Sequence, residues 1–105
     1  MTPEGKIKSK FNKKLLQLSA AYPGRIFRRM PVTRGMGAPL LDYILCVAGR
    51  FVAVEAKRDK DHSMTPQQIN TMHEIEQAGG RVFLIYDDDT INYTVETLCR
   101  YYLNS

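Results

Sequence analysis

The chain has 105 residues, of which 44% are hydrophobic and 25% charged, and its net charge is +4. This length fits one domain with one hydrophobic core, so we expect a single domain over residues 1–105 with one functional site. No apolar run approaches the ~20 residues of a membrane span, and the polar N-terminus lacks the apolar centre of a signal peptide, so we expect a cytoplasmic protein without a membrane partner. Cys46 and Cys99 lack metal-type spacing and are predicted to be small buried hydrophobic residues.

The charges are distributed unevenly along the chain. Residues 1–34 hold nine lysines and arginines against one acid, Glu4, whereas the other ten acids lie from Asp42 onward. A basic surface beside an acidic site suits a polyanion whose phosphates are held near a metal ion. The alternative is a lysine-rich helix that is merely solvated.

The first predicted element is a helix over residues 3–21. Thr2 is a suitable N-cap and Pro3 a suitable first residue. Apolar residues at three- and four-residue spacing predict its core-facing side, namely Ile7, Phe11, Leu15, Leu18 and Tyr22. Glu4 falls in the first turn, where a carboxylate favourably meets the helix dipole, so a capping role is its simplest interpretation.

Pro23 and Gly24 end this helix, and a strand is predicted over residues 25–30. Residues 34–39 then form a loop that contains two glycines and Arg34. Loops beside a scaffolded site commonly carry substrate contacts, so this one either approaches a phosphate backbone or simply connects two strands.

Residues 40–57 consist of two apolar, β-rich runs that meet at Ala48 and Gly49, which predicts a hairpin. An even-length turn centred on these two residues places Asp42 directly opposite Glu55. Facing side chains of an antiparallel pair lie about 4.5–5.5 Å apart at Cβ, and two like charges so placed repel each other.

Lys57 follows Glu55 by two residues and therefore projects from the same face of the strand. Two carboxylates and one ammonium thus converge, and Mg²⁺, with Mn²⁺ as a substitute, takes carboxylate oxygens together with waters and substrate phosphates. Lys57 can then orient or deprotonate a water, or stabilise charge on a phosphate. The simpler alternative is a solvated pair of acids at the sheet rim, with Lys57 as an ordinary ion-pair partner.

After the polar segment 58–64, Thr65 and Gln68 form a capping box that opens a helix with Pro66 at its first position. The helix is expected to end near Ala78. Its core-facing side is predicted to carry Ile69, Met72 and Ile75. Gln68 shares that side, so it can lean toward the sheet, act only as a cap, or do both.

Residues 81–86 predict a short apolar strand at the centre of the sheet, and Asp89 or Thr90 is expected to cap a final helix. The apolar side of that helix is predicted to consist of Ile91, Val95, Leu98 and Tyr102. The resulting fold class is α/β, a small mixed β-sheet flanked by helices in the order α-β-β-β-α-β-α.

The combined order of four features resembles the VRR-NUC family of the PD-(D/E)XK nuclease superfamily, and especially its stand-alone phage-type members. These features are Asp42, Glu55-Ala56-Lys57 after a hairpin, Thr65-Pro66-Gln67-Gln68 opening a helix, and Ala78-Gly79-Gly80 before an apolar strand. The resemblance runs from Thr2 to Asp87 and implies a restriction-endonuclease-like core. In the family a proline immediately precedes the aspartate, whereas here Pro39 lies three residues ahead of it.

The resemblance also implies roles for single residues. Asp42 and Glu55 would hold the metal, with the Ala56 carbonyl as a further ligand. Lys57 would serve the water or the transition state, and Gln68 would assist at the phosphate or at a water.

Together these expectations predict a Mg²⁺-dependent endodeoxyribonuclease, with selectivity for branched or junction DNA as its closest variant and a homodimer that cuts two strands. Glu4 matches the acidic residue that the family carries on its first helix. DNA contacts are expected from Lys6, Lys10, Lys13, Arg34, Arg58 and Lys60. The alternative from another class is a non-catalytic DNA-binding module that uses the basic N-terminal helix and keeps its acids for structure.

Overall fold

The computed structural model describes residues 1–31 and 40–104. One sheet has the strand order β1-β2-β3-β4, with β1 (Ile26–Arg29), β2 (Tyr43–Val47), β3 (Arg50–Ala56) and β4 (Arg81–Ile85). The first three strands pair antiparallel, and β3 pairs with β4 in parallel. The helices are α1 (Pro3–Ala21), α2 (Pro66–Gln77) and α3 (Asp88–Thr97), and the last continues into the π-helical segment η1 (Leu98–Leu103). The predicted α/β class and the predicted order of elements are confirmed.

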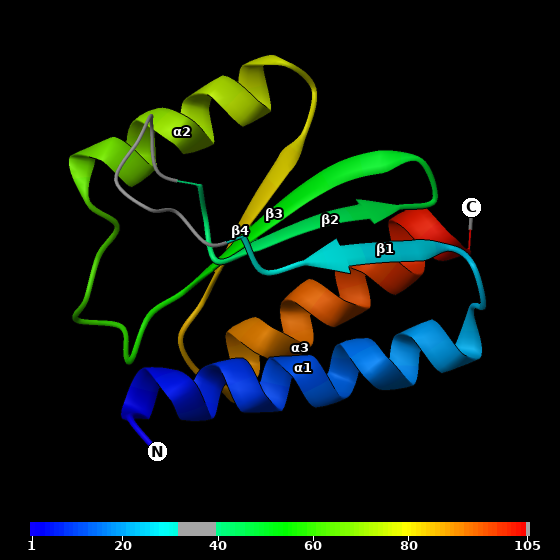
Figure 1. Ribbon diagram of the computed structural model, residues 1–105, viewed down its shortest axis with the longest axis horizontal. Helices are drawn as coiled ribbons and strands as arrows, with labels where there is room; N and C mark the ends of the chain where they lie inside the picture. The colour runs from blue at the N-terminus through cyan, green and yellow to red at the C-terminus, as the bar shows by residue number, and fades with distance from the viewer. Residues whose placement is uncertain (32–39, 105) are drawn as a thin grey trace.

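The sheet separates two helical layers. Figure 1 shows α1 and α3 on one face and α2 on the other. The hydrophobic core lies on the side of α1 and α3, where alternate residues of β2 and β3 meet the apolar side of α1. By contrast, Thr71 is the one buried residue of α2. The layer formed by α2 is therefore held much less firmly by hydrophobic burial than the layer formed by α1 and α3.

The predicted first helix coincides with α1. The Thr2 side chain accepts a hydrogen bond from the Gly5 amide at 3.0 Å, which caps the helix as expected. Four of the five predicted core residues are buried, Ile7, Phe11, Leu15 and Leu18, and Tyr22 packs at the edge of the core. Phe11 meets the ring of Tyr43 edge to face, with 5.1 Å between the ring centroids.

The hairpin has the predicted register. Val47 pairs with Arg50 and Tyr43 pairs with Val54, so the two-residue turn is centred on Ala48 and Gly49. Both turn residues have positive φ, 50° for Ala48 and 85° for Gly49, as a turn with the twist of a right-handed hairpin requires. Glycine adopts this conformation without steric cost, whereas Ala48 does not.

Two predictions about the later elements are wrong. In the described sheet β4 is an edge strand rather than a central one, because it pairs only with β3. An apolar run of five residues is compatible with either position, since a helix on each face can bury an edge strand as well. The cap of α3 is Asp87, which accepts from the Thr90 amide at 2.8 Å, and Thr90 is the third residue of that capping box.

Two side chains predicted to be buried are exposed. Ile69 of α2 is 38% exposed, because the less exposed side of α2 is formed by Gln68, Thr71, Met72 and Ile75. Cys46 is also exposed, since it lies on the α2 side of the sheet where no described helix covers it, while Cys99 is partly buried against the core. Within the described residues, no helix combines the length and the hydropathy needed to cross a membrane.

Candidate active site

Asp42 and Glu55 lie at the end of the hairpin. Tyr43 and Val54 form the last pair of the ladder, and one further step in this register brings Asp42 opposite Glu55. Side-chain alternation directs both acids to the α2 side of the sheet, since Tyr43 and Val54 face the core on the other side. The predicted juxtaposition of the two acids is therefore present.

Each of the two carboxylates accepts a hydrogen bond from a backbone amide of the opposite strand end. The Asp42 amide donates to Glu55 Oε1 at 3.1 Å, and the Ala56 amide donates to Asp42 Oδ2 at 2.9 Å. These bonds continue the hairpin beyond its last ladder pair by means of side chains. They fix both carboxylates in one orientation, because each has an oxygen committed to a backbone donor.

Glu55 is almost completely buried, with 3% of its surface exposed. Burial, followed by the negative charge of Asp42, raises the pKa of Glu55 above its ordinary value, whereas the Lys57 ammonium acts in the opposite direction. A carboxylate in this position gains from any additional positive charge. The geometry thus favours a cation close to the two acids.

Lys57 and Gln68 complete a closed cluster around Glu55. The Lys57 ammonium lies 3.2 Å from Glu55 Oε2 and donates to Gln68 Oε1 at 3.1 Å. The Gln68 amide nitrogen donates to the same Glu55 oxygen at 2.6 Å. Gln68 also caps α2, since its Oε1 accepts from the Thr65 amide at 2.9 Å. Both predicted interpretations of Gln68, as a cap and as a residue leaning toward the sheet, hold together.

Lys8 is a member of the cluster that the sequence did not single out. Its ammonium lies 3.3 Å from Asp42 Oδ1 and 3.8 Å from Glu4 Oε2, so it bridges the first turn of α1 to the hairpin. Glu4 is thereby brought to the site through Lys8. The signal available in the sequence was the four-residue spacing from Glu4 to Lys8, which is common on any charged helix and therefore undistinctive.

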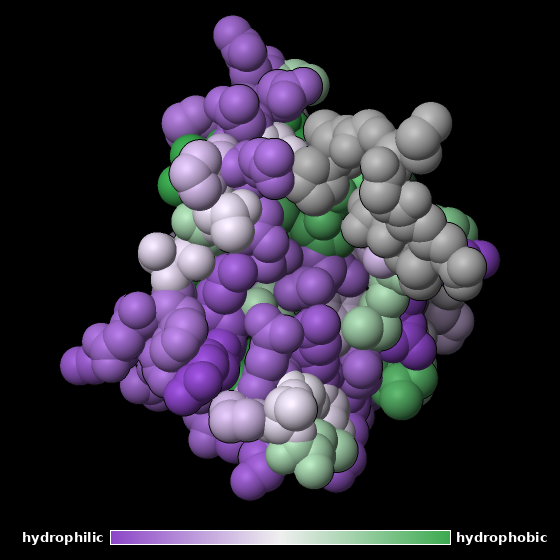
Figure 2. Space-filling view, turned by 60° about the vertical axis from the view of Figure 1, so that its left-hand side comes forward, coloured by the Kyte–Doolittle hydropathy of each residue, from purple (hydrophilic) through white to green (hydrophobic). Residues whose placement is uncertain are grey.

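A pocket of about 390 Å³ opens beside this cluster, and it is lined by Glu4, Lys57, Arg58, Asp61, His62 and Ser63. Figure 2 turns this end of the molecule toward the viewer and shows a surface composed mostly of hydrophilic residues. Its wall combines two acids, Glu4 and Asp61, with the ammonium of Lys57 and the guanidinium of Arg58. The pocket is therefore suited to a polar, charged ligand.

The residues expected to contact DNA are not equivalent. Lys6, Lys13 and Lys60 are exposed. Lys10 is engaged with Asp88 of α3 at 3.0 Å, and Arg58 with Asp59 at 3.5 Å. Arg34 lies outside the described residues, as does the loop 34–39.

The donors present fit a hard divalent cation. Asp42 and Glu55 supply carboxylate oxygens from facing positions. The Lys57 amide donates to the Ile85 carbonyl of β4. Because successive residues of a strand point their backbone groups to opposite sides, the amide and the carbonyl of Ala56 both point toward β2. The Ala56 amide accordingly donates to Asp42, and its carbonyl faces the same side. Among the described residues, no group of three or more His, Cys, Asp or Glu side chains is close enough together to hold a metal ion. Two carboxylates, completed by waters and substrate oxygens, match the coordination that Mg²⁺ usually has in proteins.

Comparison with known proteins identifies the fold. No family model matches the sequence, and no curated protein is similar to it. A solved structure described as a VRR_NUC domain superposes with a TM-score of 0.71 at 19% sequence identity, covering 97% of this chain and 100% of that one. The resemblance expected from the order of motifs is thus confirmed at the level of structure. This chain has the fold of a VRR_NUC domain.

Proposed function

We propose that this protein is a Mg²⁺-dependent endodeoxyribonuclease that hydrolyses phosphodiester bonds. One observation carries the proposal: on a VRR_NUC fold, Asp42 and Glu55 face each other with Lys57 and Gln68 bonded to the same carboxylate. A purely structural ion pair would not need a buried glutamate opposed by a second acid, because such an arrangement costs stability unless a cation compensates it.

In this proposal Asp42, Glu55 and the Ala56 carbonyl hold the ion, which, when bound, supplies positive charge for the scissile phosphate and lowers the pKa of a water. Lys57 directs its ammonium at the attacking water or at the charge that develops on the phosphate. Gln68 positions Lys57 and Glu55 relative to each other, because it accepts from one and donates to the other. Glu4 receives the Lys8 ammonium next to Asp42.

The proposal is tested with supercoiled, linear, single-stranded and four-way-junction DNA, each with Mg²⁺, Mn²⁺ or EDTA. We expect cleavage with either metal and none in EDTA, and a preference for the junction would extend the proposal to branched DNA. Lys57→Ala and Glu55→Ala should each lower the rate by about 10²-fold or more. Arg100→Ala and Glu74→Ala are the matched controls, because both residues are exposed and lie outside the cluster and outside the predicted DNA contacts.

Calorimetry separates the two roles. Glu55→Ala should lose Mg²⁺ binding, whereas Lys57→Ala should retain it, since the ammonium is not a ligand. Unchanged Mg²⁺ binding by Glu55→Ala would show that the metal site is assigned to the wrong residues.

The second candidate is a DNA-binding module without catalysis. It is favoured by the exposed lysines of α1 and by the ion pairs that already satisfy both acids in the cluster. Chelation separates the two candidates, because binding through lysines and arginines survives EDTA while cleavage does not. A homodimer, as proposed for cutting both strands, is tested by sedimentation at the concentrations used for cleavage.

A further inference from the structure

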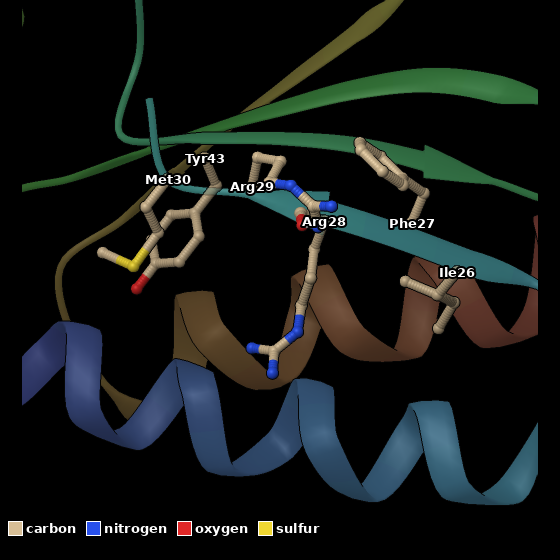
Figure 3. A pocket seen from close by; sticks show the side chains of 6 residues that line it. All are labelled: Ile26, Phe27, Arg28, Arg29, Met30 and Tyr43. Carbon is tan, nitrogen blue, oxygen red and sulfur yellow. Dashed lines mark hydrogen bonds between the residues drawn. The ribbon is translucent and has the colours of Figure 1, made fainter. Parts of the chain in front are cut away.

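A groove runs along the outer edge of β1, away from the cluster around Glu55. Within the described residues β1 pairs only with β2, so its other edge is unpaired. A cavity of about 490 Å³ follows this edge and is lined by Ile26, Phe27, Arg28, Arg29, Met30 and Tyr43. Figure 3 shows Arg28 extending toward α1, whereas Arg29 and Phe27 lie on the opposite side of the strand.

The groove carries positive charge without compensation. Its lining includes two guanidinium groups and no acid. None of the ion pairs found among the described residues involves Arg28 or Arg29. The sequence around it adds to this charge, since residues 5–41 contain no acid at all. A ligand with regularly spaced negative charge is the natural complement of such a surface.

Arg29 is held ready for such a ligand. One of its terminal nitrogens donates to the Arg28 carbonyl at 2.8 Å, and its guanidinium lies 4.4 Å from the ring centroid of Phe27. These two contacts restrict the side chain, while Arg29 remains exposed with further N–H groups to donate. A planar guanidinium presented in this way matches the geometry of a phosphate.

The groove leads toward the acidic cluster. Arg29 pairs with Ile44 of β2, and Asp42, two residues before Ile44 in the chain, points to the same face of the sheet. Two residues of a strand correspond to about 6.6 Å, which is the scale of one nucleotide step along an extended backbone. At its end the groove reaches Tyr43, whose hydroxyl donates to the Lys8 carbonyl at 3.3 Å.

We propose that the β1 edge binds the sugar–phosphate backbone of the DNA substrate, with Arg29 on a phosphate next to the one at Asp42 and Glu55 and Arg28 on the backbone at the α1 side of the same edge. This inference rests on the proposed function and names a contact surface for its substrate. A second copy of the chain is disfavoured as the occupant, because a two-fold axis would set basic edge against basic edge. An extended acidic peptide that pairs with the free edge is the other occupant that the test distinguishes.

The test measures DNA affinity by fluorescence anisotropy in EDTA at several salt concentrations, with a labelled single strand and a labelled duplex. Arg28→Gln and Arg29→Gln should each weaken binding and reduce the slope of log affinity against log salt by about 1. The double variant should lose about twice that slope. Arg100→Gln is the matched control, because Arg100 is an exposed arginine outside the groove. Arg28→Lys and Arg29→Lys retain the charge and should recover most of the slope.

Each outcome bears on a different statement. If the double variant has the DNA affinity and the salt slope of the parent, the proposal that the β1 edge binds DNA is wrong, while the nuclease proposal is unaffected. If the parent binds DNA and the variants lose it, but no metal supports cleavage, the groove stands and the nuclease proposal fails. Absence of DNA binding by the parent overturns the groove, and so does tighter binding of poly-L-glutamate than of DNA at equal salt.

Discussion

The Lys8 ammonium lies between two carboxylates, Asp42 and Glu4, in a position that a bound cation would influence directly. In the metal-free protein it neutralises Asp42 and therefore offsets part of the repulsion between Asp42 and Glu55. A divalent ion at Asp42 would repel the ammonium, which could then be retained by Glu4 alone. Lys8 is in this respect a built-in competitor of the metal.

Lys8→Met should therefore act in opposite directions on stability and on metal affinity. Without metal, the free energy of unfolding of the variant should be about 1 kcal/mol lower than that of the parent, because Asp42 loses its ion-pair partner. Its Mn²⁺ affinity should rise about fivefold or more, since one unit charge near the ion is removed. Lys13→Met on the exposed side of α1 is the control for both measurements. Equal Mn²⁺ affinity in Lys8→Met and the parent would contradict the competition.

Tyr43 supplies a pH-dependent prediction. Its burial, and then the charge of Asp42, raise the pKa of the phenol from 10.0 to about 12. The neutral phenol is thus favoured in the folded protein, so its contribution is complete below pH 10 and is lost as the pH rises through 12. We expect Tyr43→Phe to lose less stability than the parent over this range, by at most about 2–3 kcal/mol.

Chemical denaturation in EDTA at pH 8 to 11.5 measures this difference. Tyr93→Phe is the control, because Tyr93 is 57% exposed. Parallel stability curves for the parent and Tyr43→Phe would show that the folded protein does not suppress ionisation of this phenol.

At the scale of elements, the N-terminal cap of α2 and the cluster around Glu55 share one side chain, that of Gln68. Gln68 Oε1 accepts from the Thr65 amide at the start of the helix and from Lys57 in the site, so loss of the cap also loosens the cluster around Glu55. Since Thr71 is the one buried residue of α2, hydrophobic burial does little to resist that loosening.

Thr65→Ala should consequently destabilise α2 by about 1 kcal/mol. Hydrogen exchange should accelerate in residues 66–77, while the amides of β2 and β3 keep the rates of the parent. Thr2→Ala, which removes the equivalent cap of α1, should leave exchange in α2 unchanged. Uniform acceleration across the whole chain in Thr65→Ala would mean that α2 does not open separately.

Local sequence signals predicted the elements where turn chemistry and periodicity agreed. Ala48 and Gly49 fixed the hairpin register, and with it the meeting of Asp42 and Glu55. The position of β4 at the edge was not predictable, because strand order depends on which strand pairs with β3. Lys8 was missed for a similar reason: the bridge to Asp42 depends on how α1 docks on the sheet, and helical periodicity carries no information about docking.

At the scale of the whole molecule, the site is assembled from parts with very different separation along the chain. Asp42 and Glu55 are joined by a two-residue turn, whereas Lys8 comes from α1 and Gln68 from the crossover between β3 and β4. Short loops close faster than long ones, and a parallel pair needs the whole crossover before it can form. The hairpin can therefore form before Lys8 and Gln68 reach its two acids.

The facing acids then have a kinetic consequence. If the hairpin is already formed in the folding transition state, Asp42 and Glu55 repel each other there without Lys8. Asp42→Asn should fold faster in EDTA because this repulsion is removed, and unfold faster because the native ion pair with Lys8 is lost. Stopped-flow refolding and unfolding measure both rates, with Glu74→Gln as the control, and a change confined to unfolding would place hairpin closure after the transition state. The two charges proposed to hold a cation would thus slow the folding of the domain that carries them.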